Sequence, residues 1–220
     1  MDNKEFAAAV VARLALLYPA AECALEYRGE PWKLMVMARL SAQCTDKRVN
    51  EVGIPLFEKY PTPEALADAD LSDVEEIVRP CGLYRMKAKD IIAECRRLCD
   101  VYGGVLPCDM DPLLTFEGVG RKIANLLLGD IYKKPAIVAD THCIRISARL
   151  GLTPEGTNDP YKTEKILSGL IEPDEQSDLC HRLVLFGREY CKAVGFDCGA
   201  CPLADICKKQ IKKDKKKTGA

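Results

Sequence analysis

The sequence predicts an all-α protein, because apolar residues recur with helical spacing along most of the chain. Near the start, Phe6, Val10, Leu14 and Leu17 follow this spacing. Helix-capping and helix-ending residues agree with it, since Gly103-Gly104 closes a long periodic segment. The one strand-like run, PAIVAD at 135–140, is short. Together these observations favour a helical fold without a sheet.

The expected helices follow one another along the chain. The first lies within residues 1–19, and another begins where Thr62 precedes Pro63 and Glu64. Ser72 stands at the start of a further helix, and Asp140 is a candidate N-cap. The segments with clear helical period are 32–43, 46–60, 71–80, 86–104, 120–132, 141–152 and 178–191.

Composition places the chain among globular proteins. It has 220 residues, of which 48% are hydrophobic and 30% charged, with a net charge of −1. No apolar run approaches the roughly 20 residues of a membrane span. The N-terminal segment has acidic residues ahead of its apolar part, so we interpret it as an amphipathic helix and not a signal peptide. We expect a cytoplasmic protein with reduced thiols and no membrane partner.

Twelve cysteines are many for this length, and four of them gather near the end of the chain. Cys191, Cys198, Cys201 and Cys207 follow the spacing Cys-x6-Cys-x2-Cys-x5-Cys. Such spacing is typical of metal ligands, either of tetrahedral zinc or of an iron–sulfur cluster. The single CxxC pair favours the iron–sulfur cluster over a zinc ribbon. A lysine-rich tail, residues 208–220, follows directly and is either a solubilising segment or a phosphate-seeking arm.

A Gly-x-Gly turn joins two predicted helical segments. Gly118-Val119-Gly120 would expose backbone N–H groups at the start of the next helix, which is an arrangement that binds phosphate. A plain helix-turn-helix corner would explain the same glycines. Lys122 stands in the first helical turn, where the helix dipole and partial burial would lower its pKa and make its amine nucleophilic. Asp140 could assist that amine, although helix capping alone would explain it.

In combination these segments resemble the endonuclease III family of helix-hairpin-helix DNA glycosylases. The residues that carry the resemblance occur in the family's order and span most of the chain. They are LSAQCTDKRVN (40–50), CGLYRMKAKDI (81–91), GVGRKIAN (118–125), VADTH (138–142) and the cysteine loop (191–207). The chain departs from the family at Phe116-Glu117, where Leu-Pro is usual, and at Leu114, where relatives can carry an acidic residue.

The resemblance implies a fold of two helical lobes. A six-helix barrel would comprise residues 24–134, with the helix-hairpin-helix at about 113–132. The second lobe would combine residues 1–23 with 135–220 and hold a 4Fe–4S cluster on Cys191, Cys198, Cys201 and Cys207. That cluster would shape a DNA-contacting loop and take no direct part in the reaction.

The resemblance also implies an activity and its site residues. The chain would be a bifunctional DNA glycosylase and AP lyase, acting as a monomer on double-stranded DNA with damaged bases or abasic sites. Lys122 and Asp140 would be catalytic. The residues implied to contact DNA are Gln43, Leu83, Gly118, Val119, Gly120 and Arg121.

Two other functions remain open from the sequence. One is an adenine or mismatch glycosylase of the same superfamily, although such enzymes often lack a lysine at the position of Lys122. The other is a non-catalytic DNA-binding module that uses the hairpin only to hold phosphate.

Overall fold

The computed structural model describes residues 2–209 of the chain. In this range the protein is helical and contains no strand, which confirms the predicted all-α class. Residues 135–140 form no regular secondary structure, and no other segment in the described range pairs with them as a strand. The side chains of Ala136, Ile137 and Val138 are instead buried in the core. None of the described helices is long and apolar enough to span a membrane.

The chain divides into two compact units, Cys23–Lys134 and the combination of Met1–Glu22 with Pro135–Ala220. Residues 210–220, which include most of the predicted lysine-rich tail, lie outside the described residues. The roles expected of the two lobes, a barrel and a cluster lobe, stay predictions.

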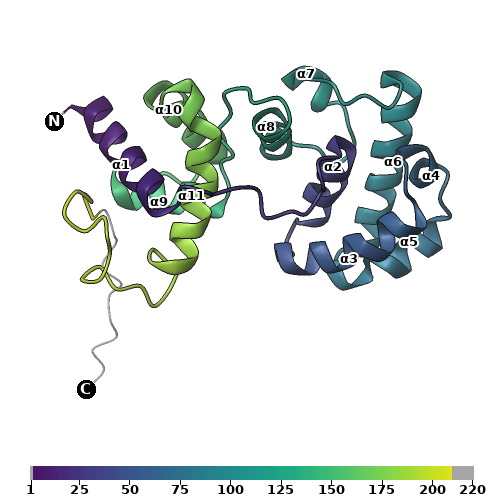
Figure 1. The fold of residues 1–220 in the computed structure, drawn as a ribbon, viewed down its shortest axis with the longest axis horizontal. Helices are drawn as coiled ribbons and strands as arrows, with labels where there is room; N and C mark the ends of the chain where they lie inside the picture. The colour runs from purple at the N-terminus through teal and green to yellow at the C-terminus, as the bar shows by residue number, and fades with distance from the viewer. Residues whose placement is uncertain (1, 210–220) are drawn as a thin grey trace. The chain divides into compact units, whose positions relative to one another are not determined.

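The unit Cys23–Lys134 is built around one long helix, α6 (Tyr84–Tyr102), against which several shorter helices pack (Figure 1). The inward face of α6 carries Ala88, Ile91, Cys95 and Leu98, all fully buried. The chain leaves α6 through Gly103 in a left-handed conformation, as the predicted Gly-Gly ending requires. The other elements are α2 (Pro31–Leu40), α3 (Asp46–Lys59), α4 (Pro63–Ala67), α5 (Leu71–Val78), η1 (Arg79–Cys81), α7 (Met110–Leu113) and α8 (Arg121–Asp130).

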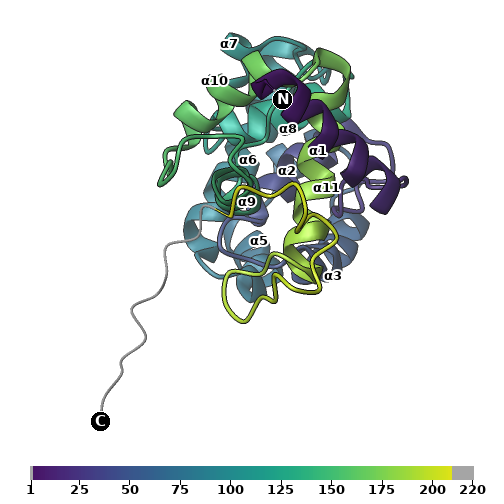
Figure 2. The same ribbon diagram turned by 90° about the vertical axis from the view of Figure 1, so that its left-hand side faces the viewer.

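In the other unit, α1 (Asn3–Leu17) packs against α10 (Pro160–Leu170) and α11 (Gln176–Glu189), and α9 (Thr141–Leu150) packs against α11 (Figures 1 and 2). A short helix, η2 (Pro173–Glu175), leads into α11. The helices α9 and α11 approach closely at Gly187, where an added Cβ would lie 2.4 Å from His142 Nδ1. The first helix begins with a capping box, in which Asp2 and Glu5 each accept a backbone N–H from the other.

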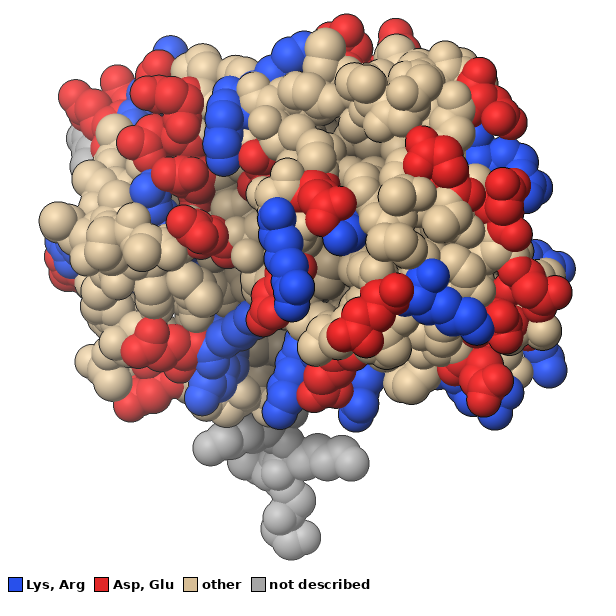
Figure 3. Space-filling model, turned by 45° about the vertical axis from the view of Figure 1, so that its right-hand side comes forward, with Lys and Arg blue, Asp and Glu red and all other residues tan. Residues whose placement is uncertain are grey.

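The charge distribution agrees with the near-neutral composition. On the face shown in Figure 3, acidic and basic side chains are interspersed over the surface. Several charged side chains of the described residues form exposed ion pairs, such as Lys59 with Asp73 at 2.7 Å. Exposed pairs of this kind stabilise a fold only slightly.

Unlike these exposed charges, Glu94 is fully buried on the inward face of α6. Neither of its carboxyl oxygens has a hydrogen-bond partner among the described residues. Burial raises the pKa of Glu94 well above its ordinary value; the nearby Arg39 opposes this shift and Asp90 adds to it. The carboxyl group therefore keeps its proton over a pH range in which an unfolded chain would lose it.

This difference predicts how stability depends on pH. A raised folded-state pKa gives stability that is complete below the ordinary pKa of a glutamate and is lost as pH rises toward the folded pKa. In wild type we expect the free energy of unfolding to decline with rising pH by up to about 1.4 kcal/mol per pH unit. Glu94→Gln, which cannot ionise, should remove this decline. Urea unfolding of wild type and Glu94→Gln at several values from about pH 5 to about pH 8 measures this decline. The exposed Glu58→Gln is the control, and parallel curves for Glu94→Gln and wild type would contradict the expectation.

Candidate active site

The Gly-x-Gly turn lies directly before α8, as predicted. Gly118 has a φ of +73°, a left-handed value that favours glycine. Gly120 is the N-cap of α8 and gives it no side-chain cap. The Val119 side chain is buried, and its N–H donates to Phe116 O at 3.2 Å. The start of α8 therefore keeps backbone N–H groups that no cap side chain satisfies, which is the arrangement that favours an anion.

Phe116 and Glu117, which stand where the family usually has Leu-Pro, have different environments. Phe116 is buried and stacks on Tyr102 of α6, with ring centroids 5.3 Å apart. Thr115, just before it, accepts a hydrogen bond from Arg97 Nε at 2.9 Å. Glu117 is exposed. The approach to the turn is thus fixed on α6 by an aromatic stack and a hydrogen bond.

Lys122 is exposed in the first turn of α8. Partial burial, expected from the sequence, is wrong, because α8 buries a different stripe, formed by Ala124, Leu127 and Leu128. Arg121, next to it, is half-buried. The amine at this position is therefore accessible, and burial does not contribute to its reactivity.

Asp140 is the N-cap of α9, as its position before Thr141 predicted. One carboxylate oxygen accepts a hydrogen bond from Cys143 N at 2.7 Å, and the residue is half-buried. The buried segment 136–139 fixes the chain on its N-terminal side. Asp140 belongs to the unit that contains Pro135–Ala220, whereas Lys122 belongs to Cys23–Lys134.

Gln43 and Leu83 share an unusual backbone conformation. Their φ values are +54° and +50°, in the left-handed region that residues with a Cβ rarely adopt. Gln43 is exposed, and Leu83 is 49% exposed although it is a large apolar residue. Strained backbone of this kind persists where the surrounding structure holds it, and it often marks functional positions.

The four predicted metal ligands lie in one loop after α11. Burial raises the pKa of Cys201 and of Cys207, and the neighbouring thiols raise both further. Among residues 2–209, no group of three or more His, Cys, Asp or Glu side chains is arranged to hold a single metal ion. Cys191 and Cys198 are nevertheless close enough to Cys201 and Cys207 to act on them electrostatically.

Two arginines of α9 hold the carbonyl groups of this loop. Arg149 donates to Lys192 O at 2.6 Å and to Ala193 O at 3.1 Å, and its guanidinium lies 4.3 Å from the centre of the Phe196 ring. Arg145 donates to Cys191 O at 3.1 Å. From α1, Arg13 donates to Pro202 O at 2.9 Å. These arginines could not be predicted from the sequence, because an arginine on a helix surface carries no signal of its partner.

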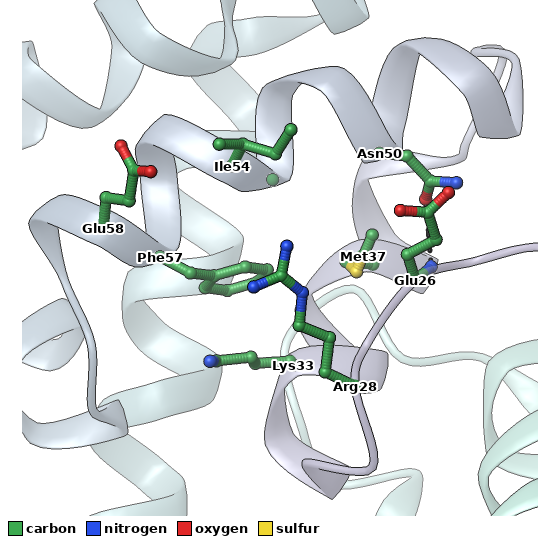
Figure 4. A pocket seen from close by; sticks show the side chains of 9 residues that line it. Glu26, Arg28, Lys33, Met37, Asn50, Ile54, Phe57 and Glu58 are labelled. Carbon is green, nitrogen blue, oxygen red and sulfur yellow. Dashed lines mark hydrogen bonds between the residues drawn. The ribbon is translucent and has the colours of Figure 1, made fainter.

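A separate cavity of about 110 Å³ lies in the unit Cys23–Lys134 (Figure 4). The Arg28 side chain reaches toward the Phe57 ring, and Glu26 and Asn50 lie together on one side. Its lining residues are Glu26, Arg28, Lys33, Met37, Asn50, Gly53, Ile54, Phe57 and Glu58. None of the predicted site residues is among them.

Comparison with known proteins identifies the family. Residues 36–173 match the HhH-GPD superfamily of base excision DNA repair proteins, and the chain belongs to it. It is 40% identical to endonuclease III of Bacillus subtilis over 200 residues, which cover 91% of this chain and 90% of that protein. It is also 40% identical to endonuclease III of Synechocystis over 207 residues, 94% and 93% of the two chains.

Solved structures agree with this family assignment. A trapped endonuclease III–DNA covalent intermediate superposes with a TM-score of 0.88 at 40% identity, covering 96% of this chain and 98% of that chain. A thermostable thymine-DNA glycosylase has a TM-score of 0.84 but only 17% identity, so that likeness concerns the fold alone. The predicted resemblance is confirmed, as is the prediction of a base-excision DNA glycosylase with AP lyase activity.

The geometry of the Gly118–Gly120 turn predicts that alanine substitutions at its two glycines affect stability differently. A Cβ on Gly118 would lie 2.4 Å from Arg39 Nε and 2.6 Å from Arg39 Cδ, whereas a Cβ on Gly120 would meet nothing within 4 Å. We expect Gly118→Ala to lower the free energy of unfolding by at least about 1–2 kcal/mol, the cost of left-handed backbone, plus the displacement of Arg39. Gly120→Ala is the matched control, and urea unfolding compares them. Equal stability of the two variants would contradict the steric argument.

Proposed function

We propose that the chain removes oxidised pyrimidines from duplex DNA and cleaves the strand 3′ to the resulting abasic site through a Schiff base on Lys122. The observation that carries this proposal is an exposed lysine in the first turn of α8, directly after the Gly118–Gly120 turn. A solved relative at 40% identity is a trapped covalent intermediate with DNA. A covalent intermediate requires a nucleophile, and an exposed primary amine can act as one.

The damaged base must leave the stack before its sugar can be attacked. We assign Gln43 to the vacated space in the duplex and Leu83 to a wedge between neighbouring bases. Their exposure and left-handed backbone support these roles. The amides at the start of α8, together with Gly118, Val119, Gly120 and Arg121, would hold the phosphate backbone beside the lesion.

The chemistry follows from a primary amine. Lys122 Nζ, in its uncharged form, forms a bond to the sugar C1′ while the C1′–N bond breaks and the base leaves with the electron pair. The nitrogen loses a proton, and its lone pair then forms a C=N bond to C1′ while the C1′–O4′ ring bond breaks and O4′ takes a proton, which gives a protonated imine. Removal of a C2′ proton then breaks the C3′–O bond, which cleaves the strand by β-elimination, and water finally releases the sugar from the lysine.

Asp140 would accept a proton from Lys122 and stabilise the positive charge that develops on the sugar. Its hydrogen bond from Cys143 N supports this role, because it fixes the carboxylate at the start of α9. The N-terminal end of a helix also favours the negative charge of the group.

We further propose that Cys191, Cys198, Cys201 and Cys207 hold a 4Fe–4S cluster. The residues present fit the group, because the neighbouring thiols of Cys191 and Cys198 help to raise the pKa of Cys201 and of Cys207, and Gly195, with a φ of +70°, lets the loop turn between them. When bound, the cluster would shape the loop that Arg145 and Arg149 hold. Tetrahedral zinc is the competing occupant.

The oligomeric state, the location and the substrate class of the enzyme are also proposals. We propose that it acts as a monomer on damaged double-stranded DNA in the cytoplasm, associated with the nucleoid. An adenine or mismatch glycosylase is the alternative substrate class, and a duplex panel with single oxidised, mismatched or abasic positions separates the two. A non-catalytic DNA-binding module would bind such duplexes without changing them.

Borohydride trapping on an abasic-site duplex tests the amine. Borohydride reduces the imine to a stable amine, so wild type should form a covalent adduct and cut the strand. Lys122→Gln should do neither while still binding the duplex, because it removes the amine and leaves the turn intact.

Asp140→Asn is the companion variant, since its amide oxygen can still accept from Cys143 N. We expect it to slow cleavage by about 10²- to 10⁴-fold, the usual contribution of a general acid or base. Trapping that survives in Lys122→Gln would refute the assignment of the nucleophile. Duplex binding by wild type with no adduct would favour the non-catalytic module.

The cluster is tested by metal and sulfide analysis of the purified protein. A 4Fe–4S protein is brown, absorbs near roughly 400 nm and contains about four iron and four sulfide per chain. Cys198→Ser should lose most of this absorbance, whereas Cys108→Ser, an exposed cysteine outside the loop, should keep it. Stoichiometric zinc in colourless wild-type protein would overturn the proposed cluster.

A further inference from the structure

A stripe of charged residues runs along the inward face of α6. Lys87, Asp90 and Glu94 are three and four residues apart, so they lie on one side of the helix. Lys87 and Glu94 are fully buried, and the Asp90 side chain is 19% exposed. Charged side chains are rarely buried in this way unless they are paired or hydrogen-bonded.

The Lys87 ammonium joins the ends of two helices. Its Nζ donates to Leu40 O at 2.9 Å and to Cys81 O at 2.8 Å. Leu40 is the last residue of α2, and Cys81 is the last residue of η1. Carbonyl groups at helix ends lack partners within their own helix, and a cation there is also favoured by the helix dipole. Burial lowers the pKa of Lys87, but an uncharged amine can still donate to both carbonyls.

Both helix ends lead directly into residues assigned to DNA insertion. Three residues after Leu40 the chain reaches Gln43, and two residues after Cys81 it reaches Leu83. Each turn passes through a left-handed residue, so each needs support from outside to keep its conformation. A single buried side chain provides one such support to both turns.

Asp90 connects the same helix face to the Gly-x-Gly turn. Its Oδ2 accepts from Arg39 Nε at 2.7 Å and lies 2.5 Å from Arg39 Nη2. The Arg39 side chain in turn lies against Gly118, because a Cβ there would be 2.4 Å from Nε. Arg39 directly precedes Leu40, so α2 brings both connections to the same place.

We propose that Lys87, with Asp90 and Arg39, is a positioning residue that holds the Gln43 turn, the Leu83 turn and the Gly118 turn in one arrangement on α6. This inference rests on the proposed function, since it concerns how the turns act on duplex DNA. Insertion residues can replace a flipped nucleotide only if they keep their spacing while the duplex is opened. The buried stripe would keep that spacing.

Lys87→Met tests the proposal, because methionine retains an apolar side chain in the buried site and removes both hydrogen bonds. We expect base removal from a lesion duplex to fall by about 10- to 100-fold, the scale of small errors in positioning. Borohydride trapping on a single-stranded abasic oligonucleotide should stay at the wild-type level, since no stacked duplex has to be opened. Lys89→Met, at an exposed lysine of the same helix, is the matched control and should retain duplex activity.

Two further measurements distinguish positioning from a general loss of stability. Amide hydrogen exchange of Lys87→Met should accelerate at residues 41–44 and 81–83 together, more than elsewhere in the unit. In a double-mutant cycle, Lys87→Met should add little to a variant that already carries Gln43→Ala and Leu83→Ala, because coupled residues are not additive. Should Lys87→Met not fold, Lys87→Gln replaces it, as its shorter side chain keeps a donor but cannot span both carbonyls.

The outcomes separate the inference from the function on which it rests. Wild-type duplex activity and unchanged exchange at both turns in Lys87→Met would overturn the inference and leave the lyase proposal intact. An equal loss on duplex and single-stranded substrates would also overturn it, since that pattern indicates general damage. Wild-type protein that forms no borohydride adduct would instead refute the proposed function.

Discussion

The unit Cys23–Lys134 depends on the way α6 buries charged side chains against the ends of its neighbours. Helices that end inside a protein leave carbonyl groups that need a donor. Lys87 supplies that donor to Leu40 O and Cys81 O, and Asp90 fixes the Arg39 side chain beneath Gly118. A buried charge is costly unless it is well bonded. The same contacts that offset this cost also fix the turns on which the proposed DNA contacts lie.

Most of the fold follows from periodicity and capping. The ends of α6 and α9 lie within two residues of the segments predicted as 86–104 and 141–152, because Gly103 and Asp140 mark those boundaries chemically. The helix α10 was not predicted, although Asp159 caps it and Pro160 begins it. The strand-like run 135–140 forms no strand, in agreement with the predicted all-α fold. Its apolar residues are buried by packing, and no neighbouring segment of residues 2–209 offers strand pairing.

The site could be predicted only where a residue type carries its own chemistry. Cysteine spacing, a Gly-x-Gly turn and a lysine after it are visible in the sequence. The exposure of Lys122 is not visible in the sequence, because it depends on which stripe of α8 is buried. The buried position of Lys87 does have a signal in the sequence. It lies four residues before Ile91 and eight before Cys95, on the apolar face of the predicted helix. A charged residue in such a stripe indicates a buried partner.

The two units contribute different parts of the proposed reaction. The unit Cys23–Lys134 carries the amine, the insertion residues and the phosphate-binding turn, whereas the other carries Asp140 and the cysteine loop. The central claim is that the attacking amine is that of Lys122. Protease digestion and mass spectrometry of the borohydride-trapped DNA adduct test it most directly. The account predicts the reduced sugar on Lys122 Nζ, and an adduct on the N-terminal amine or on another lysine would contradict it.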